Sequence, residues 1–202
     1  MRKLLSDTVT QQALLTLVVQ LFTKGLRVLV CIMVARWVSI NDFAQFIFGF
    51  TIATIGCRIV LLGAPQVLSR EWGRSDAPPK QKYQGLINVA HWFFIRGIFL
   101  TLVGFLGFGA IHFFFLDKEL AHVDLSVYSF SMILPLFIVQ LIGAVFTAQK
   151  KVWLGSVFEL FFNLSFLFII LFGVFFSLSL SVMLVVQCIL MSMLGLMYYR
   201  FY

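Results

Sequence analysis

The chain is poor in charged residues, and acidic residues are the scarcest of these. Only 11% of its 202 residues are Asp, Glu, Lys or Arg, and only 8 are acidic. A soluble domain of this length needs far more charged surface to stay dispersed in water. The composition therefore excludes an ordinary soluble globular protein.

Cysteine is equally sparse. Cys31, Cys57 and Cys188 all lie within apolar runs, where a cysteine usually packs as a small hydrophobic side chain. Their spacing matches neither a disulfide framework nor a zinc motif. We therefore expect no metal site and no cofactor.

Long apolar runs are what the sequence has in abundance. Hydrophobic residues make up 61% of it, with 25 phenylalanines. A transmembrane helix needs about 20 mostly apolar residues. Six such segments are predicted, at Thr8–Trp37, Phe43–Leu68, Ile87–Leu116, Leu125–Gln149, Trp153–Phe176 and Leu180–Tyr199. The expected fold is an all-α transmembrane bundle of about six helices, forming one domain over residues 1–202.

The connections between these segments are expected to be polar. Ser69–Gln84 contains Ala77-Pro78-Pro79-Lys80 and is predicted to be a water-exposed loop. Asp117–Asp124 is predicted to be a short polar turn on the opposite side. Since every connection is short, no separate domain is expected between the helices.

The distribution of Lys and Arg predicts the orientation. The net charge is +7, but the bases form short clusters between apolar runs, which argues against a nucleic-acid-binding surface. A cytoplasmic N-terminus leaves only Arg36 and Lys118 on the far side. It places nine bases in the cytoplasm: Arg2, Lys3, Arg70, Arg74, Lys80, Lys82, Lys150, Lys151 and Arg200. The positive-inside rule thus predicts a multi-pass protein with both termini in the cytoplasm.

Polar residues within the first segment form one face. An ionisable group at mid-bilayer costs at least about 2.5–3.5 kcal/mol, yet Lys24 and Arg27 lie near the middle of this segment. At 100° per residue, the polar side chains fall within a sector of about 120°. They are Gln12, Thr16, Gln20, Thr23, Lys24, Arg27 and Cys31. This face is predicted to line a cavity rather than contact lipid.

The second segment repeats this design. Thr51, Thr54, Arg58 and Ser69 are predicted to share one side of a continuous helix. Glycines recur every seven residues on a different side, where small residues let helices approach closely. These glycines are Gly49, Gly56 and Gly63.

Glu159 is the only acid deep in a predicted helix, on a stripe with Ser156 and Asn163. Lys24, Arg27 and Arg58 could form a basic, water-accessible cavity for an anionic substrate, or an internal salt-bridge network with Glu159. One acid cannot neutralise three bases, which favours the cavity. Glu159 is then a candidate for an ion pair or for proton coupling.

One spacing could suggest an enzyme. His112 and Asp117 have the His-x-x-x-x-Asp spacing of some acyltransferases. However, the spacer is Phe-Phe-Phe-Leu, the site falls at the outer end of a helix, and no partner motif follows. We therefore do not expect an enzyme.

Three stretches near the first two segments resemble a known family. They are Val34-Ala35-Arg36-Trp37, Asn41-Asp42-Phe43-Ala44-Gln45-Phe46 and Leu62-Gly63-Ala64-Pro65-Gln66-Val67-Leu68-Ser69-Arg70-Glu71. They resemble the opening of the O-antigen and polysaccharide flippases, in the multidrug/oligosaccharidyl-lipid/polysaccharide exporter superfamily. The sequence departs from that pattern at Trp37-Val38 and Ala44, where leucine-glycine and glycine are usual.

The resemblance implies a function and a site. Such flippases have two helical lobes, and the segments here match the N-terminal lobe. The resemblance implies a cavity between lobes whose basic residues meet the diphosphate of a polyprenol-linked oligosaccharide, in the bacterial inner membrane, during O-antigen and lipopolysaccharide biosynthesis. Lys24, Arg27 and Arg58 are the positions that could carry this role. A second six-helix lobe or a homodimer partner would then be required.

Two other functions remain open. A multidrug or organic-cation antiporter of the same superfamily would favour acidic residues in its cavity, whereas this chain offers three bases and one acid. A non-transporting membrane subunit or scaffold is the other alternative.

Overall fold

The computed structural model describes residues 2–73, 78–115 and 132–201 of the chain. These residues form helices only, so the expected all-α fold is confirmed for the described part. The helices are α1 (Arg2–Trp37), α2 (Ile40–Val60), α3 (Ala64–Gly73), α4 (Pro79–Phe115), α6 (Ile133–Ala148), α7 (Val152–Phe175) and α8 (Leu180–Phe201).

Four stretches of these helices are long and apolar enough to cross a membrane. They are Thr10–Trp37, Ile40–Gly73, Lys80–Gly104 and Val152–Phe175. Two shorter helical stretches, Ile133–Ala148 and Leu180–Met193, are also apolar. Many large apolar side chains point outward, Leu21 and Phe22 of α1 among them, at 69% and 67% exposed. An apolar exterior of this kind suits a lipid environment.

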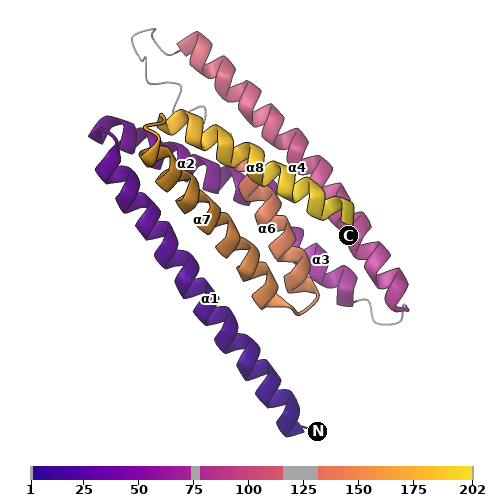
Figure 1. The fold of residues 1–202 in the computed structure, drawn as a ribbon. Helices are drawn as coiled ribbons and strands as arrows, with labels where there is room; N and C mark the ends of the chain where they lie inside the picture. The colour runs from indigo at the N-terminus through magenta and orange to yellow at the C-terminus, as the bar shows by residue number, and fades with distance from the viewer. Residues whose placement is uncertain (1, 74–77, 116–131, 202) are drawn as a thin grey trace.

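The helices lie side by side, and the chain reverses direction between α1 and α2, between α6 and α7 and between α7 and α8, whereas α3 continues the direction of α2 (Figure 1). The connections at 37–40 and 175–180 lie at one end of the bundle, and the end of α3, the start of α4 and the connection at 148–152 lie at the other. Helix α6 is central, because it contacts α2, α3, α4, α7 and α8. Its almost uninterrupted apolar sequence fits this position, and Phe137 in its second turn is fully buried.

Helix α1 lies at the edge of the bundle and packs mainly on α7. It contacts α2 only sparsely, although the two are joined directly through Val38 and Ser39. Helix α2 starts with a side-chain cap, in which Ser39 Oγ accepts a hydrogen bond from the Asp42 backbone N–H. The chain can therefore turn sharply after α1 without packing α2 along it.

The predicted second segment is not one continuous helix. Helix α2 ends at Val60, and Gly63 adopts a left-handed φ of 82° before α3 begins at Ala64. Pro65 fits the first turn of α3, where its missing N–H costs no helical hydrogen bond. Ser69 therefore belongs to α3, and its predicted place on the same helix face as Arg58 is wrong.

The predicted loop at Ser69–Gln84 is also largely wrong. Helix α3 continues to Gly73, and α4 already begins at Pro79, a favoured residue at a helix start. Leu68 of α3 is fully buried, and the Trp72 ring packs edge-on against Tyr83 of α4 at 4.9 Å. These apolar contacts stabilise helix where a polar composition alone predicts a loop.

The remaining boundaries agree more closely. Helices α7 and α8 begin and end within two residues of the predicted fifth and sixth segments. Helix α4 begins eight residues before Ile87, and the described part of the fourth segment begins with α6 at Ile133. The predicted turn Asp117–Asp124 and residues 125–131 lie outside the described residues.

Candidate functional site

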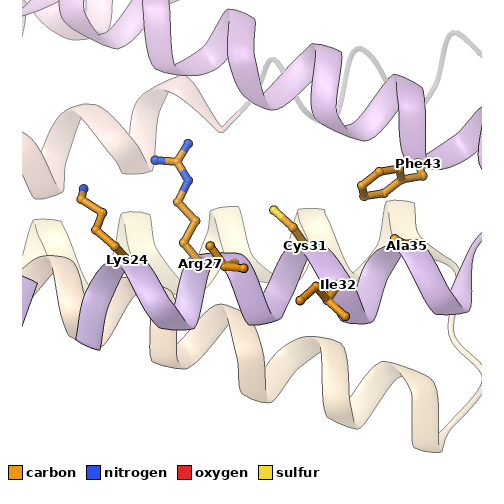
Figure 2. Close-up of a pocket in the computed structure, with 7 residues that line it drawn as sticks. Lys24, Arg27, Cys31, Ile32, Ala35 and Phe43 are labelled. Atoms are coloured by element: carbon orange, nitrogen blue, oxygen red, sulfur yellow. The ribbon is translucent and has the colours of Figure 1, made fainter. Parts of the chain in front are cut away.

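A cavity of about 400 Å³ opens between α1 and α2. It forms where these two helices diverge beyond their short connection. Its lining comes from one side of α1 and from the start of α2, namely Lys24, Arg27, Val28, Cys31, Ile32, Ala35 and Phe43. Lys24, Arg27 and Cys31 leave α1 toward the helix that carries Phe43, whereas Ile32 points away (Figure 2).

Lys24 is tied to the neighbouring helix α7. Its Nζ donates a hydrogen bond to Glu159 Oε1 at 3.1 Å, and the two side chains form a salt bridge. Lys24 precedes Trp37 by nearly four helical turns, about 20 Å along α1. The side chains of the pair are nevertheless 63% and 41% exposed. This ion pair is therefore deep along a candidate span but open on one side.

Arg27 reaches across the cavity to α2. Its Cζ lies 4.5 Å from the centre of the Phe50 ring, a cation–π contact. Stacking covers one face of a guanidinium but leaves its in-plane N–H groups able to donate. Phe50 therefore fixes the position of Arg27 without using its hydrogen-bonding capacity.

Arg58 stands apart from the other two cations. It is exposed on α2, two turns beyond Phe50 on the same helix face, and it does not line the α1–α2 cavity. The structure thus brings Lys24 and Arg27 together and leaves Arg58 outside their cavity. Arg96, on α4, lies with its Cζ 5.4 Å from the Trp92 ring on the same helix.

In the structure, the residues of the predicted polar face of α1 lie in different surroundings. Thr23 is buried, at 1% exposed, and its hydroxyl donates to the Val19 carbonyl of the same helix. Gln20 faces a second cavity, and only Lys24, Arg27 and Cys31 of that face line the first.

The second cavity, of about 290 Å³, lies between α1, α3, α6 and α7. Its polar lining consists of Gln20, Gln140, Thr147, Ser156 and Glu159. Gln140 and Thr147 cannot be predicted from the sequence, because isolated polar residues in an apolar helix form no stripe. The carboxylate that lines this cavity is the one that pairs with Lys24, so a single ion pair joins the two cavities.

Asn163 and Gln187 line neither cavity, and their side chains make structural hydrogen bonds. Asn163 is buried, and its Nδ2 donates to the Glu159 backbone carbonyl at 2.8 Å. Gln187 of α8 is fully buried, and its Nε2 donates to Ser165 Oγ at 3.1 Å. Both bonds satisfy buried amides, and the bond from Gln187 also links α8 to α7.

The described residues hold no group of three or more His, Cys, Asp or Glu that could bind a metal ion. The side chain of His112 and all of Asp117 lie outside that description.

Comparison with known proteins identifies the family. A family model for "Polysaccharide biosynthesis protein" matches residues 9–202. No curated protein and no solved structure matches the chain. The match covers nearly the whole sequence and confirms the family resemblance found in the first two segments. The chain is a multi-pass, all-helical membrane protein that belongs to the polysaccharide biosynthesis protein family.

Proposed function

We propose that the chain forms one lobe of a flippase that moves a polyprenyl-diphosphate-linked oligosaccharide across the bacterial inner membrane. The family assignment supports a role in surface-polysaccharide synthesis, of which O-antigen assembly on lipopolysaccharide is one form. The observation that carries the proposal is the pair of cations, Lys24 and Arg27, whose side chains border one largely apolar cavity within a candidate span.

The chemistry of these side chains suits a diphosphate. A guanidinium can hold two phosphate oxygens at once, while an ammonium acts as a point charge that tolerates several geometries. Both interactions strengthen where water is scarce. The apolar remainder of the cavity lining, including Phe43 and Val28, provides such surroundings.

The exposure of the Lys24 side chain supports a second helical wall on the open side of the cavity. A Lys24 side chain that is 63% exposed cannot face lipid at this depth without a cost of about 2.5–3.5 kcal/mol or more. We propose that a second six-helix lobe, on the same polypeptide or on a second copy of the chain, covers this side. The substrate would then pass between two polar walls.

The test is transport of a fluorescent lipid-linked oligosaccharide in proteoliposomes that contain the complete two-lobed assembly. Arg27→Ala should lower the transport rate by about tenfold or more, because a charge-assisted hydrogen bond contributes about 1.5–3 kcal/mol. Arg27→Lys should retain part of the rate, since it keeps the charge. Lys151→Ala, in the exposed turn before α7, is the matched control and should transport normally.

Other outcomes favour other functions. Normal transport by Arg27→Ala, at normal protein yield, would contradict the proposal. Export of an organic cation in place of the lipid-linked sugar would favour an antiporter. A complete assembly that transports neither would favour a scaffold.

A further inference from the structure

Gln149, at the end of α6, is a buried amide without a partner. It is 7% exposed, and among the described residues neither its Oε1 nor its Nε2 has a hydrogen-bond partner. Buried amides in native proteins are normally hydrogen-bonded, so an unpaired one needs an explanation. The amide nitrogen has two hydrogens to donate, and an anionic oxygen is a strong acceptor for them.

Gln149 lies on the side of α6 that packs against α3 and α4. It follows Ile142 by seven residues, which places both on the same side of the helix. Ile142 belongs to the core cluster that contains Leu68 of α3 and Leu86 of α4. The unpaired amide therefore lies at the end of the core that α6 shares with these two helices.

Lys82 of α4 is level with Gln149 along the bundle. The Phe137 ring of α6 stacks on the Phe94 ring of α4, with ring centres 6.5 Å apart, and the two helices run in opposite directions (Figure 1). Each residue advances a helix by about 1.5 Å. Gln149, twelve residues after Phe137, is therefore level with Lys82, twelve residues before Phe94. Lys82 is half-buried and precedes the buried Leu86 by one turn.

Lys150 adds a second base beside the amide. It follows Gln149 directly, is exposed, and has a left-handed φ of 62° in the turn between α6 and α7. Within the described part of the chain, neither Lys82 nor Lys150 forms a salt bridge. The two connections at the opposite end, 37–40 and 175–180, contain no lysine or arginine. The positive charge at this end is thus available to an anion from outside the chain.

Aromatic side chains place this end at the surface of the membrane. The Trp72 ring of α3 packs edge-on against Tyr83 of α4, and Trp and Tyr are enriched where a bilayer meets water. Lys82 is the neighbour of Tyr83 and lies near the start of the candidate span Lys80–Gly104. Lipid headgroups therefore lie at the level of Lys82 and Gln149.

We propose that the end formed by α3, α4 and α6 binds the headgroup of an anionic phospholipid, whose phosphate is held by Lys82, Lys150 and the Gln149 amide. Two bases complement the net negative charge of such a headgroup, whereas they repel the ammonium of a zwitterionic one. A soluble phosphate has the same charge but lacks the acyl chains that hold a lipid at this level. The site lies outside the anion cavity and does not depend on the proposed function.

Native mass spectrometry of the purified chain in detergent measures the binding. The probes are phosphatidylglycerol and phosphatidylcholine with the same acyl chains, and phosphatidylglycerol should bind at least about fivefold more tightly. Lys82→Gln and Lys150→Gln should each weaken phosphatidylglycerol binding about fivefold, the effect of one base near an anionic lipid surface. Gln149→Leu should weaken it too, yet should raise the Tm of the lipid-free protein, because it removes an unpaired buried amide.

Lys151→Gln and Arg36→Gln are the matched controls. Lys151 is the next residue in the same turn, but it leads into α7, which contacts neither α3 nor α4 within the described residues. Arg36 is exposed at the opposite end of the bundle. Both variants should keep the affinity for phosphatidylglycerol. Equal losses in Lys150→Gln and Lys151→Gln would show diffuse attraction of lipid to basic residues and would overturn the site.

Tighter phosphatidylglycerol binding that Lys82→Gln and Lys150→Gln weaken, and that both controls keep, is the supporting result. Equal affinity for the two lipids would overturn the proposal. So would glycerol 3-phosphate binding as tightly as the lipid, which would assign the site to soluble phosphates. Displacement of the lipid by polyglutamate, dependent on the same two lysines, would assign it to an acidic protein instead. A lower Tm for lipid-free Gln149→Leu would show a structural amide and overturn its part in the site.

Discussion

At the scale of single residues, the sequence reveals unusual charges but not their partners. Lys24, Arg27 and Glu159 stand out because each interrupts a long apolar run. Which base meets Glu159 depends on which helix packs beside α7 and in what register. Helix α1 does so, and Lys24 is the base that makes the contact. No periodicity within one helix contains that information.

The sequence does not reveal the aromatic residues of the cavity either, but for a different reason. Phe50 positions Arg27, and Phe43 closes one end of their cavity. A chain with 25 phenylalanines gives no reason to select these two. Only the approach of α2 to α1 distinguishes them from phenylalanines that face lipid.

Glycines illustrate how a residue's importance depends on its neighbour. A Cβ added to Gly155 of α7 would lie 3.0 Å from the Gly143 Cα and 3.1 Å from its carbonyl oxygen. A Cβ added to Gly143 would meet nothing closer than 4.0 Å. Gly155→Ala should therefore lower the free energy of unfolding by about 1–3 kcal/mol, through overpacking between α6 and α7. Thermal unfolding of the purified protein in one detergent is the measurement.

Gly143→Ala is the matched control for this prediction. It adds the same methyl group to the same helix contact, and both changes gain helix propensity. We expect no loss of stability from it. Equal destabilisation by the two substitutions would show that the close approach is not what makes Gly155 necessary.

At the scale of secondary-structure elements, apolar runs predict helices well and helix breaks poorly. Helices α7 and α8 follow directly from their apolar sequences. The break after α2 cannot be predicted from the sequence, because residues 43–68 form one apolar run with a seven-residue glycine spacing. Gly56 does pack against another helix, since a Cβ there would lie 2.9 Å from the Ile133 side chain. A Cβ on Gly63 would meet nothing within 4 Å.

The role of Gly63 is therefore conformational. Its φ of 82° lies in the left-handed region, which costs other L-residues about 1–2 kcal/mol. Gly63→Ala should lower the free energy of unfolding by about that amount. Gly73→Ala is the matched control, because a Cβ at Gly73 also meets nothing within 4 Å and its φ is not left-handed. A comparable loss in both variants, measured by thermal unfolding, would contradict a backbone origin.

At the scale of the whole molecule, the alternation of helices agrees with the distribution of charge. The start of α4 and the connection at 148–152 share one end of the bundle, and Lys80 and Lys151 belong to this end (Figure 1). The opposite end holds the connections at 37–40 and 175–180. The fold thus provides a basic end, but the side of the membrane that this end faces stays a prediction.

Accessibility of single cysteines decides this orientation. Cys31, Cys57 and Cys188 would first be replaced, and cysteine then introduced at Lys80, Lys151 or Ser179, all of which are exposed. In intact cells with a permeabilised outer membrane, a membrane-impermeant thiol reagent should label Ser179→Cys and spare Lys80→Cys and Lys151→Cys. The physical reason is that Lys- and Arg-rich connections are retained in the cytoplasm during insertion. Disruption of the inner membrane should then expose both protected positions, which proves that they react when reached. Labelling of Lys80→Cys in intact cells, with Ser179→Cys protected, would invert the orientation and place the basic end outside.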